Sequence, residues 1–175
     1  DKKVMLDLYA DYQRQNWQPS FHHSRNMVKG LIAYSVPKVT LGVEAFINHG
    51  KNDIAGTSGI NTDTLSANAK GISVFVRGPL DKAKLGYFAR FDSFNPYDGF
   101  DNTFTSYKQL SSGYEPNTKE RFITAGLDYA PVKNVHFMPN IWYTKYVAQQ
   151  SNLSGRAKED HDMVYRLTFS YVFGK

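Results

Sequence analysis

Apolar and polar residues alternate in steps of two along much of the chain, most clearly in segment 162–173. One set of alternate positions is apolar or aromatic: Met163, Tyr165, Leu167, Phe169, Tyr171 and Phe173. Most of the intervening positions are polar: Asp162, Arg166, Thr168 and Ser170. Because successive side chains of a β-strand point to opposite faces, the pattern predicts a strand with one apolar and one polar face.

Seven further segments alternate in the same way and predict strands over about 3–13, 28–36, 40–48, 72–77, 85–92, 123–129 and 135–144. Short connections are expected at 37–38, 78–82 and 131–134. Residues 15–26 and the stretches 49–69, 95–120 and 149–160 are polar, and we expect them to be loops. Pro139 lies inside the predicted strand 135–144 and has no N–H for a ladder, so we expect a bulge at Pro139 and Asn140.

Composition narrows the class of protein. Aromatic residues make up 15% of the 175 residues, yet mean hydropathy is −0.49, a mixture that alternating strands produce. No apolar run is long enough for a transmembrane helix. The absence of Cys excludes a disulfide framework, and the net charge of +5 is scattered, which argues against a nucleic-acid partner. No export signal opens the chain, so we expect any such signal to have been removed or to lie outside it.

About eight strands with alternately short and long connections predict an all-β fold, an antiparallel up-and-down transmembrane β-barrel. We expect residues 1–175 to form a single domain of this kind, with lipid outside and water inside. Aromatic residues lie near the predicted strand ends, where interfacial girdles would fall. Those near short turns are Tyr34, Tyr129 and Phe173, and those near long loops are Tyr12, Phe91 and Tyr143.

Charged residues lie opposite the apolar rows and are the candidates for lining a pore. They are Lys29, Glu44, Arg77, Arg90, Asp92, Asp128 and Arg166. In a large barrel they would border water. In a barrel closed with only eight strands they would pair across a filled interior.

No residue pattern indicates catalysis. His22 and His23 are adjacent and would point opposite ways, so they rarely share a metal ion without a distant third ligand. Oxygen-bearing residues at 95, 98, 101 and 102 do not match the spacing of an EF-hand. We therefore expect no enzyme activity, catalytic residue, metal or cofactor.

Several strand and turn phrases resemble porins of the phosphate-selective porin superfamily, especially the branch of Bacteroidota-type outer membranes. They are NVHFMPNIWY (134–143), FITAGLDYAP (122–131), VYRLTFSYVFGK (164–175), KGLIAYSVPKVTLGVEAFINHGKND (29–53) and LGYFARFDSFNP (85–96). The resemblance implies a barrel of about sixteen strands, of which this chain is the C-terminal portion. Phosphate-specific members carry an Arg ladder, whereas the candidate residues here alternate in sign, so we expect a general porin.

The function predicted is an outer-membrane porin of a Gram-negative-type envelope, a passive diffusion channel for small hydrophilic solutes or ions. Its partners would be outer-membrane lipid and those solutes, and a homotrimer is one assembly that the sequence leaves open. The alternative is a closed eight-stranded barrel with a structural or adhesive role. A soluble ligand-binding barrel such as a lipocalin would have the apolar rows inside, and an outer-membrane enzyme is the weakest option.

Overall fold

The computed structural model describes residues 3–18, 21–80, 84–100, 103–110, 115–132, 134–151, 153 and 160–171. Within these residues the fold is all-β, with nine strands in one antiparallel sheet. The strands are β1 (Lys3–Gln18), β2 (Phe21–Val36), β3 (Val39–Ser58), β4 (Asn61–Pro79), β5 (Leu85–Asn95), β6 (Ser106–Gln109), β7 (Thr118–Tyr129), β8 (Val135–Ala148) and β9 (His161–Tyr171). No helix in the described part of the chain has the length and apolar character needed to cross a membrane.

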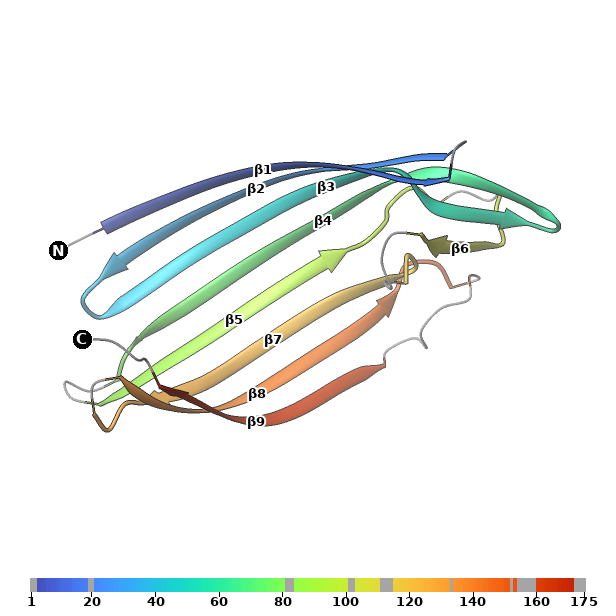
Figure 1. The fold of residues 1–175 in the computed structure, drawn as a ribbon. Coiled ribbons are helices and arrows are strands. Elements are labelled where there is room, and N and C mark those ends of the chain that lie inside the picture. Colours follow the sequence, from blue (N-terminus) through green and yellow to red (C-terminus); the bar gives the residue numbers. More distant parts are fainter. Residues whose placement is uncertain are drawn as a thin grey trace.

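The sheet follows chain order, β1-β2-β3-β4-β5-β7-β8-β9, and the short β6 pairs with β3 beside this path. Strands β1 and β9 form its two edges and are not paired with each other. Figure 1 shows a curved sheet, open between these edges, with both chain ends at the end where the β2–β3, β4–β5 and β7–β8 connections lie. We call this the turn end and the opposite one the loop end.

The eight predicted strands are all present, and two predicted short turns are confirmed. Pro37 and Lys38 connect β2 to β3, where Val36 pairs with Val39. The connection from β7 to β8 ends at Asn134, whose positive φ of 76° fits a turn residue.

Two segments predicted to be loops are instead strand. Residues 49–69 form the outer half of the β3–β4 hairpin, which turns at Gly59 and Ile60, with Ser58 paired to Asn61. Gly59 has a positive φ of 59°, as a two-residue hairpin turn with Gly first requires. Residues 15–26 likewise belong mostly to β1 and β2, which run to Gln18 and from Phe21. Strand β6, within the predicted loop 95–120, makes the count nine rather than eight.

The bulge predicted at Pro139 and Asn140 is wrong. Gly126 pairs with Asn140 and Tyr129 with Phe137 in one register, and the β8–β9 pairing continues through Pro139 without a shift. The Asn140 side chain donates from Nδ2 to the Met138 carbonyl at 2.8 Å, which adds a local hydrogen bond beside the proline. Register shifts occur elsewhere, between Asn16 and Gln18 of β1 and between Gly50 and Ile54 of β3.

The irregularity in β3 changes its partner. Up to Lys51, β3 pairs with β2, whereas residues 54–57 pair with β6. Asn52, between these two parts, has a positive φ of 56°, and its side chain donates to the His22 carbonyl at 2.9 Å. Beyond this point the hairpin therefore leaves β2 and joins the connection between β5 and β7.

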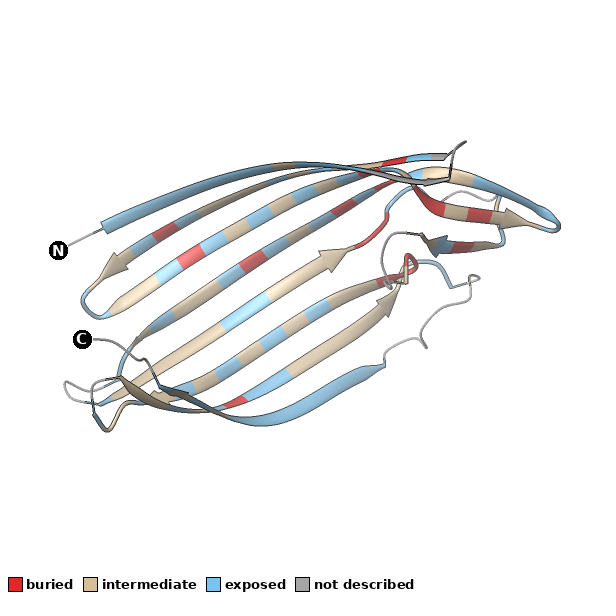
Figure 2. Ribbon diagram, viewed as in Figure 1, coloured by how far each residue is buried: buried red, intermediate tan, exposed pale blue. Residues whose placement is uncertain are grey.

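The buried apolar core among the described residues lies at the loop end. Its members, the cap cluster, are Ile54, Ala67, Tyr97 and Tyr107, with Leu65, Phe100, Phe104 and Leu153 packed against them. The rings of Phe100 and Tyr107 meet edge to face, 4.9 Å apart. Figure 2 shows buried positions on the β3–β4 hairpin and on β6 in this region. Residues 49–69, which were predicted to be a polar loop, thus contribute Ile54, Leu65 and Ala67 to this core.

We predict that Ile54→Ala loosens the cap cluster. Ile54 is 0% exposed, and truncating a buried Ile costs about 2–5 kcal/mol. Amide hydrogen exchange of Ser106–Gln109 should become faster because β6 pairs with β3 at this position. Ile60→Ala is the matched control, since Ile60 is fully exposed, and it should leave that exchange unchanged. Equal exchange in both variants would contradict this role of Ile54.

Candidate functional site

All seven predicted pore-lining residues lie on one face of the sheet. Residues paired across antiparallel strands share a face, as do residues two apart on one strand. Register connects Glu44 through Ser73 to Asp92, and Arg77 through Phe88, Gly126 and Asn140 to Arg166. Lys29, Arg90 and Asp128 lie on the same face, because each is two residues along its strand from a position in these two rows. We call this the inner face.

The opposite, outer face carries the apolar rows, and its side chains are the more exposed, most clearly on β3 and β7. Leu167 is 72% exposed and Val43 40%, whereas the side chain of Asp92 is 24% exposed. Hollows of about 300 and 390 Å³ open among inner-face residues, including Phe75, Arg90 and Phe122. Side chains on the hollowed side of a curved sheet converge and shield one another. The inner face is therefore the concave one.

Charged inner-face residues are mostly paired. Lys29 Nζ lies 3.3 Å from Glu44 Oε2, and Arg90 Nε lies 2.7 Å from Asp92 Oδ1 on the same strand. His136 Nδ1 lies 2.8 Å from Asp128 Oδ1. The guanidinium of Arg166 lies 3.9 Å from the centroid of the Trp142 ring, a cation–π contact that sequence reasoning missed.

Arg77 differs from these residues. Within the part of the chain that the structure describes, it makes no ion pair. It lines a hollow of about 760 Å³ at the turn end, together with Ser35, Thr40 and Asp128. An exposed guanidinium in such a place keeps all its donors available to water or to a passing solute.

The register also groups the inner charges by sign. One row across the sheet holds four carboxylates, from Asp7, Glu44, Asp92 and Asp162. A second row, nearer the turn end, holds Lys3, Arg77 and Arg166. Glu44 and Thr40, which belong to the two rows, are four residues apart on β3, or about 13 Å along the strand. The seven residues are thus spread along the sheet and do not form one compact site. Lys29 lies on the loop-end side of the carboxylate row, and Asp128 lies on the turn-end side of the cation row.

Three inner-face phenylalanines pair directly with glycines on the neighbouring strand. Phe75 lies opposite Gly42, Phe46 opposite Gly71, and Phe88 opposite Gly126. A Cβ at Gly42 or Gly71 would come within 2.3 Å of the paired ring. The rings therefore lie over the glycines instead of projecting from the sheet. Gly42 and Gly126 lie inside predicted strands and were a signal of a close approach, although not of the side chain that makes it, whereas Gly71 lies just before the predicted strand 72–77.

The histidine and calcium candidates hold protein partners instead. His22 is exposed and contacts Arg14, while buried His23 lies 3.8 Å from Asp53 Oδ1. No cluster of His, Cys, Asp or Glu suited to a metal occurs among the described residues.

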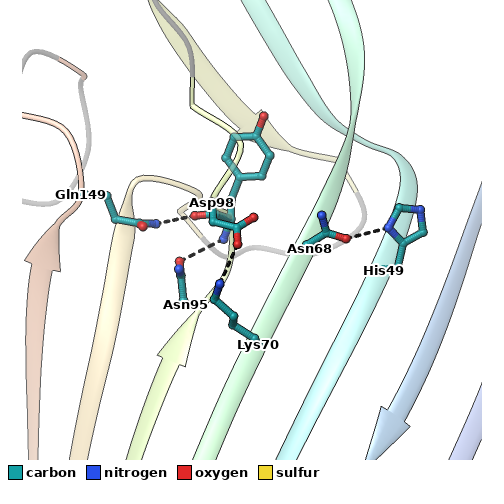
Figure 3. A network of polar contacts seen from close by, with 7 residues as sticks. His49, Asn68, Lys70, Asn95, Asp98 and Gln149 are labelled. Atoms are coloured by element: carbon teal, nitrogen blue, oxygen red, sulfur yellow. Dashed lines mark hydrogen bonds and ion pairs between the residues drawn. The ribbon is translucent and has the colours of Figure 1, made fainter.

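In Figure 3, Asp98 meets Lys70 with an Nζ–Oδ2 distance of 2.7 Å, and Asn95 accepts the Tyr97 N–H. In the same network, Gln149 donates to the Tyr97 carbonyl at 2.7 Å, and His49 bonds Asn68. The network joins β3, β4 and the connections that follow β5 and β8. Asp101 and Asn102, the other calcium candidates, lie outside the described residues.

The aromatic residues predicted to form girdles lie on the outer face where they are described. Tyr12 is 65% exposed, and Tyr34, Phe91 and Tyr129 are also exposed. Tyr143 is half-buried, and Phe173 lies outside the described residues.

Comparison of the chain with protein-family models, curated proteins and solved structures finds no match.

We predict different costs for Ala at two inner-face glycines. At Gly71 the added Cβ meets only the end of the Phe46 ring, so Gly71→Ala should cost about 1–3 kcal/mol. At Gly126 it would lie 2.6 Å from the Pro139 backbone oxygen, so Gly126→Ala should cost more. Urea unfolding of the detergent-refolded chain, followed by tryptophan fluorescence, measures both.

Double variants separate the two causes. Phe46→Ala should relieve the added cost of Gly71→Ala, whereas Phe88→Ala should relieve little of the cost of Gly126→Ala. Gly30→Ala is the control, because its Cβ would meet Leu8 at an ordinary 3.5 Å. Equal costs at Gly71 and Gly126 would refute the distinction.

Proposed function

We propose that this chain forms part of the wall of an outer-membrane porin, through which small hydrophilic solutes or ions diffuse passively. The observation that carries the proposal is the two-sided sheet. Its apolar side chains are exposed on the convex face, and its charged side chains gather on the concave face. A soluble barrel would bury the apolar rows, because exposing so many apolar side chains to water is unfavourable.

The height of the apolar surface fits a bilayer. On β8 the outward positions from Val135 to Tyr143 are apolar or aromatic, apart from Pro139, over about nine residues, or about 30 Å along the strand. A tilted transmembrane strand needs about this length. Toward the loop end the outward positions become polar: Asn26, His49, Lys70, Ser93, Arg121, Lys145 and His161. Exposed Tyr12, Tyr34, Phe91 and Tyr129 lie near the limits of the apolar surface.

The open edges require further strands or closure. Unpaired backbone groups are not tolerated where they face lipid, so the edges of β1 and β9 must find partners. Because β1 and β9 run in opposite directions, antiparallel pairing with each other or with added strands is compatible with both (Figure 1). The open curve supports the larger barrel, of about sixteen strands, over a closed ring of eight.

The inner face suits passage of solutes of either sign. Ion pairs hold Lys29 and Arg90 against Glu44 and Asp92, which leaves a wall with donors and acceptors side by side. Arg77 adds a cation near the turn end. This balance favours a general diffusion channel over one specific for phosphate.

Planar-bilayer recording tests the proposal. The full protein that contains this chain should give stable ion currents. Insertion without current would replace the porin with the closed structural or adhesive barrel. A chain that stays in solution without detergent would replace both with a soluble barrel.

Two cysteine variants provide a sharper test of sidedness, because the chain has no Cys of its own. Thr124 lies on the inner face beside Arg90, and the adjacent Ala125 lies on the outer face. We predict that a charged methanethiosulfonate reagent changes the single-channel conductance of Thr124→Cys and leaves that of Ala125→Cys unchanged. The reverse result would mean that the faces are assigned the wrong way round.

A further inference from the structure

Four basic or ionisable side chains gather on the outer face at the loop end of β7, β8 and β9. Arg121 pairs directly with Lys145, and Lys145 pairs directly with His161. Lys119 lies two residues from Arg121 on the same face. We call these four residues the basic patch.

The basic patch has no counter-charge among the residues that the structure describes. Across the described residues, no carboxylate makes an ion pair with Lys119, Arg121 or Lys145. Like charges placed directly opposite on a sheet repel and destabilise the pair. Another outward base, Lys70, does have a counter-charge, because its Nζ lies 2.7 Å from Asp98 Oδ2. A row of cations with no anionic partner in the described part of the chain leaves room for an anion from outside it.

The position of the basic patch indicates what kind of anion. The next outward row toward the turn end contains Phe91, Ile123, Tyr143 and Met163. Ile123 is 44% exposed and Met163 51%, so apolar surface begins where the cations end. A free anion would satisfy only the cations. A molecule with an anionic head and an apolar tail would cover both.

We propose that the basic patch binds the phosphate-bearing headgroup of a membrane lipid, with the lipid's acyl chains lying on Ile123 and Met163. Arg121 offers a planar fork that matches phosphate oxygens, and Lys119 and Lys145 add point charges. The inference rests on the proposed function to the extent that the outer face must meet lipid. It does not depend on whether the pore conducts.

The test uses the refolded chain in a zwitterionic detergent. Phosphatidic acid should raise the unfolding temperature and remain bound in native mass spectra, whereas phosphatidylcholine should do neither. Added salt should weaken the binding because Arg121 and His161 are exposed and Lys119 and Lys145 are partly exposed. In Arg121→Gln/Lys145→Gln, affinity for phosphatidic acid should fall at least tenfold. Lys70→Gln is the matched control, since Lys70 is an outward base already paired with Asp98, and it should bind as the parent does.

Two outcomes would overturn the proposal. One is unchanged binding in the double variant. The other is equal protection by inorganic phosphate at the same concentration, which would make the patch a free-anion site. The unfolding temperature of the double variant without lipid shows whether it folds. It should equal or exceed that of the parent, because the substitutions remove the repulsion between Arg121 and Lys145. If the parent protein conducts ions but the double variant binds phosphatidic acid as tightly as the parent, only this inference is rejected. If the patch binds lipid as predicted but the protein gives no ion current, only the proposed channel is rejected.

Discussion

Backbone hydrogen bonding between neighbouring strands is the constraint on which this structure depends. Every long strand except β1 and β9 is paired on both sides, and the pairing fixes which residues lie opposite one another. Rows of one chemical kind therefore cross the whole sheet, although their members are far apart in the sequence. Apart from the cap cluster and the prolines Pro96 and Pro116, the buried apolar residues among those described are small, namely Ala33 and Ala69. No second layer built from the described residues covers the apolar face of the sheet. An apolar surrounding such as lipid would cover it, which supports a lipid setting.

Alternation in the sequence was enough to predict the strands within the apolar surface and the face of each side chain. It failed beyond that surface. Residues 49–69 are rich in Gly, Asn, Asp and Thr, which are common in turns, yet here the two halves of the segment pair with each other as a hairpin and only Gly59 and Ile60 turn. Pro139 was expected to force a bulge, but the ladder tolerates the lost donor without a change of register. Local preference is overruled when a partner strand is already in place.

The candidate site shows the same limit. The sequence placed Lys29, Glu44 and Arg90 on one face, but their partners depend on register and side-chain direction. Lys29 reaches Glu44 across β2 and β3, and Arg90 turns along its own strand to Asp92. The row of carboxylates and the row of cations follow from the turns that set each register, so period-two patterning could not reveal them. The phenylalanines over Gly71 and Gly126 were missed because they require knowledge of the opposite residue.

The change of partner in β3 has a consequence for the order in which the structure can assemble. Residues 54–57 pair with 106–109, so about fifty residues of chain must be in place before these two segments can meet. The β3–β4 hairpin closes through a two-residue turn and needs no such delay. The hairpin can therefore form before β6 pairs with β3.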